Sequence, residues 1–190
     1  MLDLSAHKGA PMKALLAFSQ AIDRVTDFFA MFAQWAVLAA CLISASNAVV
    51  RYTADYSSNA FLEVQWYLFS ACVMLGAAQV LRVNEHVRVD VLYGRYSGRT
   101  QALFDLFGLT LFLLPVMIVM IYYSWPLFLK MFLSGEMSSN AGGLIRWPAM
   151  LMLPLGFVLV LLQGFSEIIK RVAWLNDRYN GEFHYERPLQ

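Results

Sequence analysis

The sequence contains four long stretches that carry no charged residue at all. They cover residues 28–50, 64–81, 106–129 and 147–166. A bilayer span needs roughly 20 predominantly apolar residues at about 1.5 Å rise per residue, and a span in lipid is helical because its backbone must satisfy its own hydrogen bonds. The sequence therefore predicts an all-α integral membrane bundle of four transmembrane helices. The predicted helices cover approximately 28–51, 62–82, 104–127 and 147–169.

Charge is scarce in the chain as a whole. Charged residues make up 14% of the 190 residues, whereas they make up about 25% of a typical soluble domain. Hydrophobic residues make up 59%, whereas a soluble domain has about 45–50%. The mean hydropathy of +0.55 agrees with this contrast. The net charge is only +1, and the basic residues are few and spread along the chain. Both observations argue against a nucleic-acid partner.

Histidine and cysteine are also rare. The three histidines lie outside the four apolar runs; they are His7, His86 and His184. The runs therefore contain no haem ligand of the kind that a four-helix cytochrome needs. His86 has Glu85 and Asp90 nearby in the sequence but no second histidine or cysteine to complete a metal site. The two cysteines, Cys41 and Cys72, lie in separate runs and are expected to pack as small residues.

The sequence also has no phosphate-binding loop and no nucleophile elbow. With no ionisable group inside the runs, we expect a bundle interior without a charged site, no cofactor, no metal and no enzymatic activity. The polar side chains inside the runs are expected to hydrogen-bond between helices. These side chains are Gln34, Ser44, Ser46, Asn47, Gln65, Ser70, Gln79, Thr110, Ser124 and Gln163.

Lysine and arginine are distributed unevenly about the predicted spans. The segment before the first span, the loop between the second and third spans, and the tail together hold 11 of the 14 basic residues, and the other side holds 3. Loops rich in lysine and arginine stay in the cytoplasm. This split predicts that both termini are cytoplasmic.

Three segments flank the spans. Residues 13–27 have an amphipathic pattern and are predicted to be helical, either along the inner leaflet or a partner, or as a simple extension of the first span. Residues 83–100 are predicted to form a cytoplasmic loop with a short in-plane helix. Residues 176–190 are polar and predicted to be a mobile tail.

Several residues are candidates for contacts between helices or with a partner. Small residues recur at four-residue steps in the first span, at Ala36, Ala40, Ser44 and Ala48. Such a ladder lets another helix approach closely, either within the bundle or from another chain. Glu63, where the second span begins, could pair with Arg51, contact a partner, or be a solvated acid at a helix N-terminus.

Several segments resemble those of a known family. Glu63 opens the second span and is followed by Tyr67 and Gly76. The loop then reads Arg82-Val-Asn-Glu-His86-Val-Arg-Val-Asp90, the outer loop reads Ser138-Ser-Asn-Ala-Gly-Gly-Leu-Ile-Arg-Trp-Pro148, and the fourth span contains Pro154-Leu-Gly-Phe157. In order and spacing, residues 13–171 resemble the small membrane (Q, or DctQ-type) subunit of tripartite ATP-independent periplasmic (TRAP) transporters. Asn84 departs from the small residue that many members have there.

The resemblance implies a small permease subunit in the bacterial inner membrane. Its partners would be a large multi-spanning membrane subunit, a periplasmic solute-binding protein and membrane lipid. The small subunit would scaffold the large one during ion-gradient-driven uptake of a small organic solute. Arg82, His86 and Asp90 are expected to fix the loop at the inner surface. The alternative is the membrane anchor of a redox enzyme complex.

Overall fold

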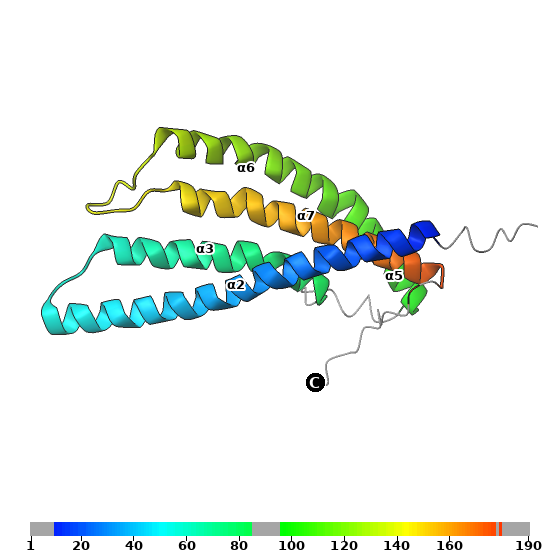
Figure 1. The fold of residues 1–190 in the computed structure, drawn as a ribbon, viewed down its shortest axis with the longest axis horizontal. Helices are drawn as coiled ribbons and strands as arrows, with labels where there is room; N and C mark the ends of the chain where they lie inside the picture. Colours follow the sequence, from blue (N-terminus) through cyan, green and yellow to red (C-terminus); the bar gives the residue numbers. More distant parts are fainter. Residues whose placement is uncertain (1–9, 85–95, 178, 180–190) are drawn as a thin grey trace, which may run out of the picture.

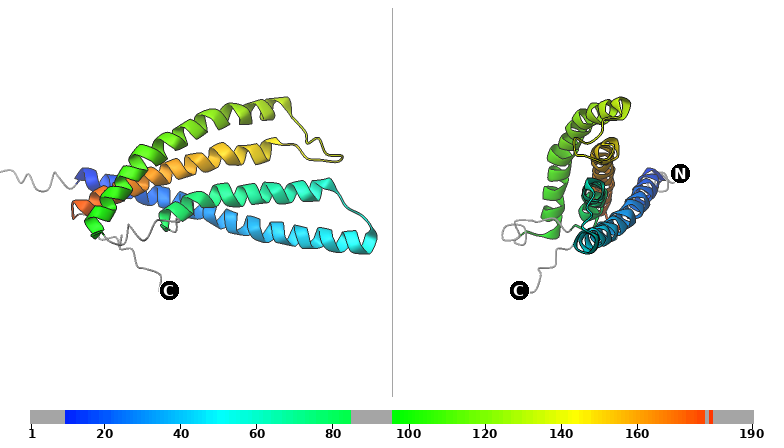
Figure 2. Two further views of the ribbon diagram at one scale, coloured as in Figure 1. Left: turned by 180° about the vertical axis from the view of Figure 1, so that it is seen from behind. Right: turned by 90° about the vertical axis from the view of Figure 1, so that its left-hand side faces the viewer.

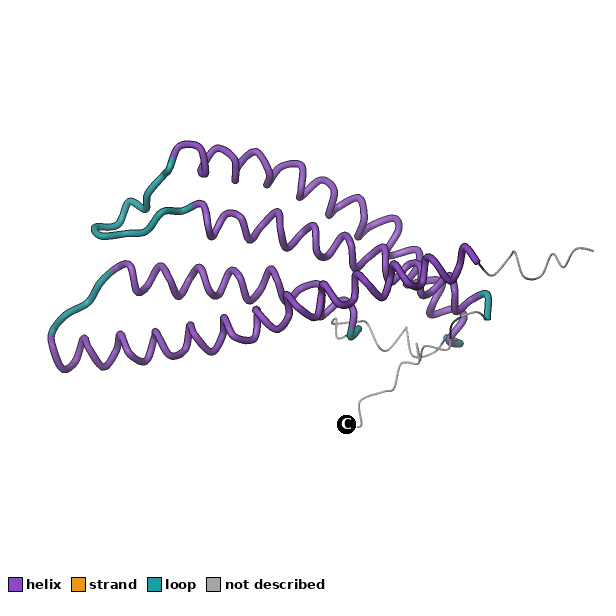
Figure 3. The backbone as a smooth tube through the Cα atoms, in the orientation of Figure 1, coloured by secondary structure: helices purple, strands orange, loops and turns teal. Residues whose placement is uncertain are grey.

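The computed structural model describes residues 10–84, 96–177 and 179. Its elements are the helices α2 (Ala10–Ala54), α3 (Asn59–Arg82), α5 (Gly98–Gly108), α6 (Leu114–Ser134) and α7 (Trp147–Leu175), and the π-helical turn η1 (Leu109–Leu113). Four helical segments are long and apolar enough to cross a membrane. The predicted all-α bundle of four membrane-spanning helices is thus confirmed, and Figure 3 shows how little of the described chain is loop.

The four long helices form two hairpins that lie side by side (Figure 1). α2 pairs with α3, α6 pairs with α7, and α7 also packs against α2 and α3. The helices converge where α2 begins and α7 ends, and they separate toward the loops 55–58 and 135–146 (Figures 1 and 2). We call the first region the terminal end of the bundle and the second region the loop end.

Residues 13–27 continue into the first span without a break. The single helix α2 has 45 residues, so it is about 67 Å long, roughly twice the thickness of a bilayer's hydrocarbon core. In its first half, Ser19, Ile22 and Thr26 are buried. These positions recur at three- and four-residue steps, which places them on one helical face. The buried face of α2 therefore extends beyond the apolar run, toward the start of the helix.

The third long helical segment, Gly98–Ser134, contains the π turn. η1 connects α5 to α6 where they pass Gly164 of α7. A Cβ atom on Gly164 would lie 2.7 Å from Leu113 Cδ2 and 3.2 Å from Leu114 Cδ2. The glycine therefore allows the side chains of the π turn to lie close to α7.

The bundle interior is built mainly from small and medium side chains. Ala33, Leu75, Ala78 and Leu159 form the buried apolar cluster where α2, α3 and α7 meet. Gly156 of α7 lies directly against Met74, because an added Cβ would come within 2.7 Å of the Met74 carbonyl oxygen. Close approach through small residues is typical of helices that pack in a membrane.

Candidate functional site

Charged side chains from four helices meet at the terminal end. We call this group the charged cluster. Its members are Asp23 and Asp27 of α2, Arg82 of α3, Asp105 of α5, and Glu167, Lys170 and Arg171 of α7. The cluster corrects the expectation of a bundle interior without a charged site, because Glu167, Lys170 and Arg171 are buried.

Lys170 lies at the centre of the cluster. Its Nζ atom lies 2.8 Å from both Oδ1 and Oδ2 of Asp23 and 2.9 Å from Oε1 of Glu167. The side chains of Lys170 and Glu167 are only 9% and 4% exposed. A buried ammonium group needs such partners, because an unpaired charge in a low-dielectric interior is strongly unfavourable.

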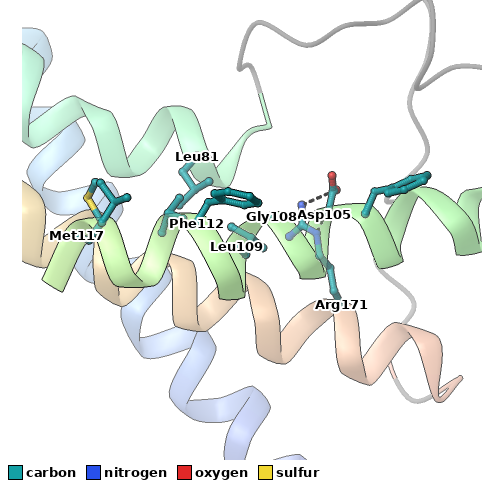
Figure 4. Close-up of a pocket in the computed structure, with 10 residues that line it drawn as sticks. Leu81, Asp105, Gly108, Leu109, Phe112, Met117 and Arg171 are labelled. Atoms are coloured by element: carbon teal, nitrogen blue, oxygen red, sulfur yellow. Dashed lines mark hydrogen bonds and ion pairs between the residues drawn. The ribbon is translucent and has the colours of Figure 1, made fainter. Parts of the chain in front are cut away.

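Arg171 connects α7 to α5. Its Nη1 atom donates to Glu167 Oε2 at 2.6 Å, and its Nε and Nη2 atoms donate to Asp105 Oδ2 at 3.2 and 3.1 Å. Figure 4 shows the Arg171–Asp105 pair among the residues that line an apolar groove of about 510 Å³, together with Leu81 and Phe112. This pair fixes α5, and with it the start of the third long segment, against α7.

Arg82 connects α3 to α2. Its Nη1 atom donates to the carboxylate of Asp27 and, at 3.2 Å, to the main-chain carbonyl of Asp23. Its Nε atom lies 3.9 Å from Asp23 Oδ1. With this connection, the cluster joins every long helix at the terminal end except α6, which is linked through α5 and η1.

A layer of neutral polar side chains lies beside the charged cluster. Thr26 Oγ1 donates to Gln163 Oε1 at 2.8 Å, and Gln163 Nε2 donates to Asp23 Oδ1 at 3.0 Å and to Glu167 Oε1 at 3.1 Å. The hydroxyls of Ser19 and Ser166 lie 2.6 Å apart. The expectation that Gln163 bonds between helices is confirmed.

The contacts of the charged cluster indicate stabilisation of the helix arrangement rather than ligand binding. Each of its three cations has at least one carboxylate partner. Buried polar groups with complete partners hold helices in one register. Within the described ranges, no three histidine, cysteine or acidic side chains are placed to hold a metal ion.

Glu63 organises the loop end. Its side chain is buried at the start of α3, beneath a loop, residues 135–146, of which half are exposed and half are partly buried. Its Oε1 atom accepts from the Ser138 hydroxyl and, at 2.8 Å, from Asn140 Nδ2, while Oε2 accepts from the Leu144 main-chain N–H at 2.6 Å. The suggested pairing with Arg51 is wrong, because the loop occupies both carboxylate oxygens and Arg51 is exposed.

The same loop makes further bonds to α3. Asn59 Nδ2 donates to the Ala141 carbonyl at 2.9 Å, and the Tyr67 hydroxyl donates to the Ile145 carbonyl at 3.0 Å. Gly143 lies against Glu63, because an added Cβ would come within 2.9 Å of Oε1 and 2.6 Å of Ser138 Cβ. The loop that joins α6 to α7 is therefore built onto the other hairpin.

The small-residue ladder of α2 divides into two parts. Ala36 is buried and Ala40 is half-buried, so both pack within the chain. Ser44 and Ala48 are exposed. Of the predicted loop residues, Arg82 contacts α2, and His86 and Asp90 lie outside the described residues.

The comparisons with known proteins give one finding. A family model described as "Tripartite ATP-independent periplasmic transporters, DctQ component" matches residues 40–173, more than two thirds of the chain. No curated protein and no solved structure matches. The matched region includes Glu63, Arg82, Asp105 and the α7 residues of the charged cluster, while Asp23 and Asp27 precede it. The chain belongs to the family of DctQ components, the small permease subunits of tripartite ATP-independent periplasmic transporters.

Proposed function

We propose that this chain is a rigid scaffold for the large membrane subunit of its transporter. The complex would take up a small organic solute, delivered by a periplasmic binding protein and driven by an ion gradient. One observation carries the proposal. Apart from Glu63 at the loop end, the buried charges of the described helices are paired with one another at the terminal end, whereas the four apolar runs contain no charge at all.

A subunit that carried the solute or the coupling ion would need polar or charged groups along its path through the membrane. Here the buried charged groups of the described helices contact other helices or, for Glu63, the loop 135–146. Residues 82–99 and the two terminal segments are also rich in lysine and arginine. We infer from this that the terminal end faces the cytoplasm of a bacterial cell and the loop end faces the periplasm.

The test is reconstitution of uptake in liposomes. The chain, the large subunit and the binding protein are combined with an imposed ion gradient, and each membrane subunit is also tested alone. We expect uptake only when both membrane subunits are present, and we expect the large subunit to copurify with this chain in mild detergent. Uptake by this chain alone, or undiminished uptake by the large subunit without it, would contradict the proposal.

The redox-anchor alternative is not favoured by the family assignment. It predicts a haem absorbance band in the purified complex. A spectrum without that band, measured on the same preparation that supports uptake, removes the alternative.

A further inference from the structure

The terminal end of the bundle has its charges inside and large apolar side chains outside. The side chains of Glu167, Lys170 and Arg171, in the charged cluster, are at most 9% exposed. Six apolar side chains at the same end are 44–57% exposed, and we call them the α2 stripe (Phe18, Val25 and Phe28) and the α5 stripe (Leu103, Phe104 and Phe107). A domain in water has the opposite arrangement, because water favours exposed charges and buried apolar groups. Charges that face the bundle interior and pair with one another are typical of a protein surrounded by lipid.

The first half of α2 lies beside the end of the fourth apolar run. The hydroxyl of Ser19 is 2.6 Å from that of Ser166, and Thr26 Oγ1 is 2.8 Å from Gln163 Oε1. Gln163 and Ser166 belong to the run 147–166, which is long enough to cross the hydrocarbon core on its own. This part of α2 therefore lies at a depth that the run reaches, although charged residues interrupt its own apolar sequence.

Basic side chains accompany both stripes. On α5, Arg99 is followed at four-residue steps by Leu103 and Phe107, so the three residues share one helical face, and the side chain of Arg99 is 70% exposed. On the first half of α2, Lys13 and Arg24 are exposed. Long basic side chains beside apolar surface extend their charged ends to the headgroup level of a membrane. Each helix thus offers apolar surface to acyl chains and cations to phosphates.

The helices that carry the two stripes lie on opposite sides of the bundle. In the right-hand view of Figure 2, α2 lies on one side of α3 and α7, and the segment formed by α5 and α6 lies on the other. A single partner helix could cover one of the stripes. A lipid leaflet surrounds the whole bundle and covers both of them.

We infer that phospholipid surrounds the charged cluster, with acyl chains against the two stripes and headgroup phosphates against Lys13, Arg24 and Arg99. The cluster then lies inside the membrane boundary rather than in water. The first half of α2, which crosses α7 (Figure 1), lies in the interfacial region with its stripe toward the acyl chains. The inference goes beyond the proposed scaffold function and does not depend on it.

The experiment is spin-label accessibility in nanodiscs of phosphatidylethanolamine and phosphatidylglycerol, with the full chain and the subunits that copurify with it. Labels are attached through Phe18→Cys, Leu103→Cys or the control Gln20→Cys, after Cys41→Ala and Cys72→Ala. Gln20 is exposed on the same helix as Phe18, but two residues turn the helix by about 200°. Oxygen concentrates in acyl chains, and a nickel chelate stays in water. We expect a several-fold higher ratio of oxygen to nickel accessibility at Phe18 and Leu103 than at Gln20.

Two results would overturn the inference. Nickel accessibility at Phe18 and Leu103 as high as at Gln20 would place the terminal end in water. Low accessibility to both reagents at either stripe position would show that a protein covers it. The scaffold function is tested separately by reconstituted uptake, so it stands or falls independently of these results.

A second measurement keeps both native cysteines. p-Benzoylphenylalanine replaces Phe18 or Phe107 in the same nanodiscs, and the products of irradiation are identified by mass spectrometry. We expect phospholipid adducts at both positions. Adducts mainly with a protein chain, or with neither protein nor phospholipid, would overturn the inference.

Discussion

The two ends of the bundle are stabilised in different ways. At the terminal end, seven charged side chains from four helices pair with one another, and Asp23 and Lys170 meet although they are 147 residues apart. At the loop end, one carboxylate, that of Glu63, accepts bonds from three groups of a single loop. The terminal end thus fixes helices relative to one another, and the loop end fixes a loop on one helix.

This difference matches the shape of the bundle. The helices converge where the charged cluster lies and separate where the loop contacts take over (Figure 1). A loss at the terminal end should therefore affect the whole chain, and a loss at the loop end should stay local. The predictions below test that contrast, starting with the largest expected effect.

Lys170→Met should be the most damaging single change. It leaves the half-buried carboxylate of Asp23 and the buried carboxylate of Glu167 without their shared cation, and breaking a buried ion pair costs about 3–5 kcal/mol of unfolding free energy. The measurement is unfolding of the purified chain in detergent. Lys130→Met, at an exposed position, is the control. Adding Asp23→Asn to Lys170→Met should recover part of the loss, and a double variant no more stable than the single one would argue against the pair.

Gly156→Ala should have the next largest effect, in the region between the two ends. The added methyl group would lie 2.7 Å from the Met74 carbonyl oxygen and from Met74 Cβ, and overpacking of this kind costs about 1–3 kcal/mol. Gly108→Ala meets nothing within 4 Å and should instead stabilise the helix by up to about 1 kcal/mol. Thermal unfolding of both variants in detergent is the measurement, and a similar shift in both would show that α3 and α7 are not in close contact at Gly156.

Glu63→Gln should release the loop without unfolding the bundle. The variant keeps the shape of the side chain but removes its charge, so the Leu144 N–H and the Ser138 hydroxyl lose a strong acceptor. We expect faster hydrogen exchange at Leu144 and faster proteolysis in residues 135–146, with the unfolding temperature nearly unchanged. Gly143→Ala should act in the same way, and Ser139→Ala, at an exposed position of the same loop, should not. A global loss as large as that of Lys170→Met would remove the contrast between the ends.

Arg99→Ala should have the smallest effect, although it also removes an ion pair at the terminal end. Arg99 lies 3.6 Å from Asp177, and their side chains are 70% and 83% exposed. Exposed pairs contribute little, so the change in unfolding free energy should stay within about 0.5 kcal/mol. A loss of several kcal/mol in the same detergent assay would mean that exposure does not separate Arg99 from Lys170.

The four spans were predictable because the length and hydropathy of each run are local properties. The charged cluster was not, because its members lie at or beyond the ends of the apolar runs and are brought together only by the register of helices distant in sequence. Asp27 and Arg82, for example, each look like an ordinary charge at the edge of a span. The extension of α2 and α7 past their runs is what brings the members of the cluster together.

Glu63 was identified from sequence, but its partners were not. Arg51 was the nearest opposite charge along the chain, and that proximity was misleading. The four-span topology already placed the serines and Asn140 of the 138–143 segment at the same end as Glu63. A carboxylate at the same end as a loop rich in hydroxyl, amide and glycine residues therefore already indicates that the loop, and not Arg51, supplies its hydrogen-bond donors. The bond from the Leu144 main-chain N–H depends on the conformation of the loop, which its composition does not determine.

The π turn at Leu109–Leu113 amounts to one residue more than a regular helix would use. Each residue of an α-helix turns the chain by about 100°. The wider π turn accommodates this additional residue, so converting the turn to regular α-helix without removing a residue would rotate α5 by about that angle relative to α6, and Asp105 would no longer point at Arg171. The pairing of the third span with the charged cluster thus depends on a phase offset within the helix as well as on which residues are present.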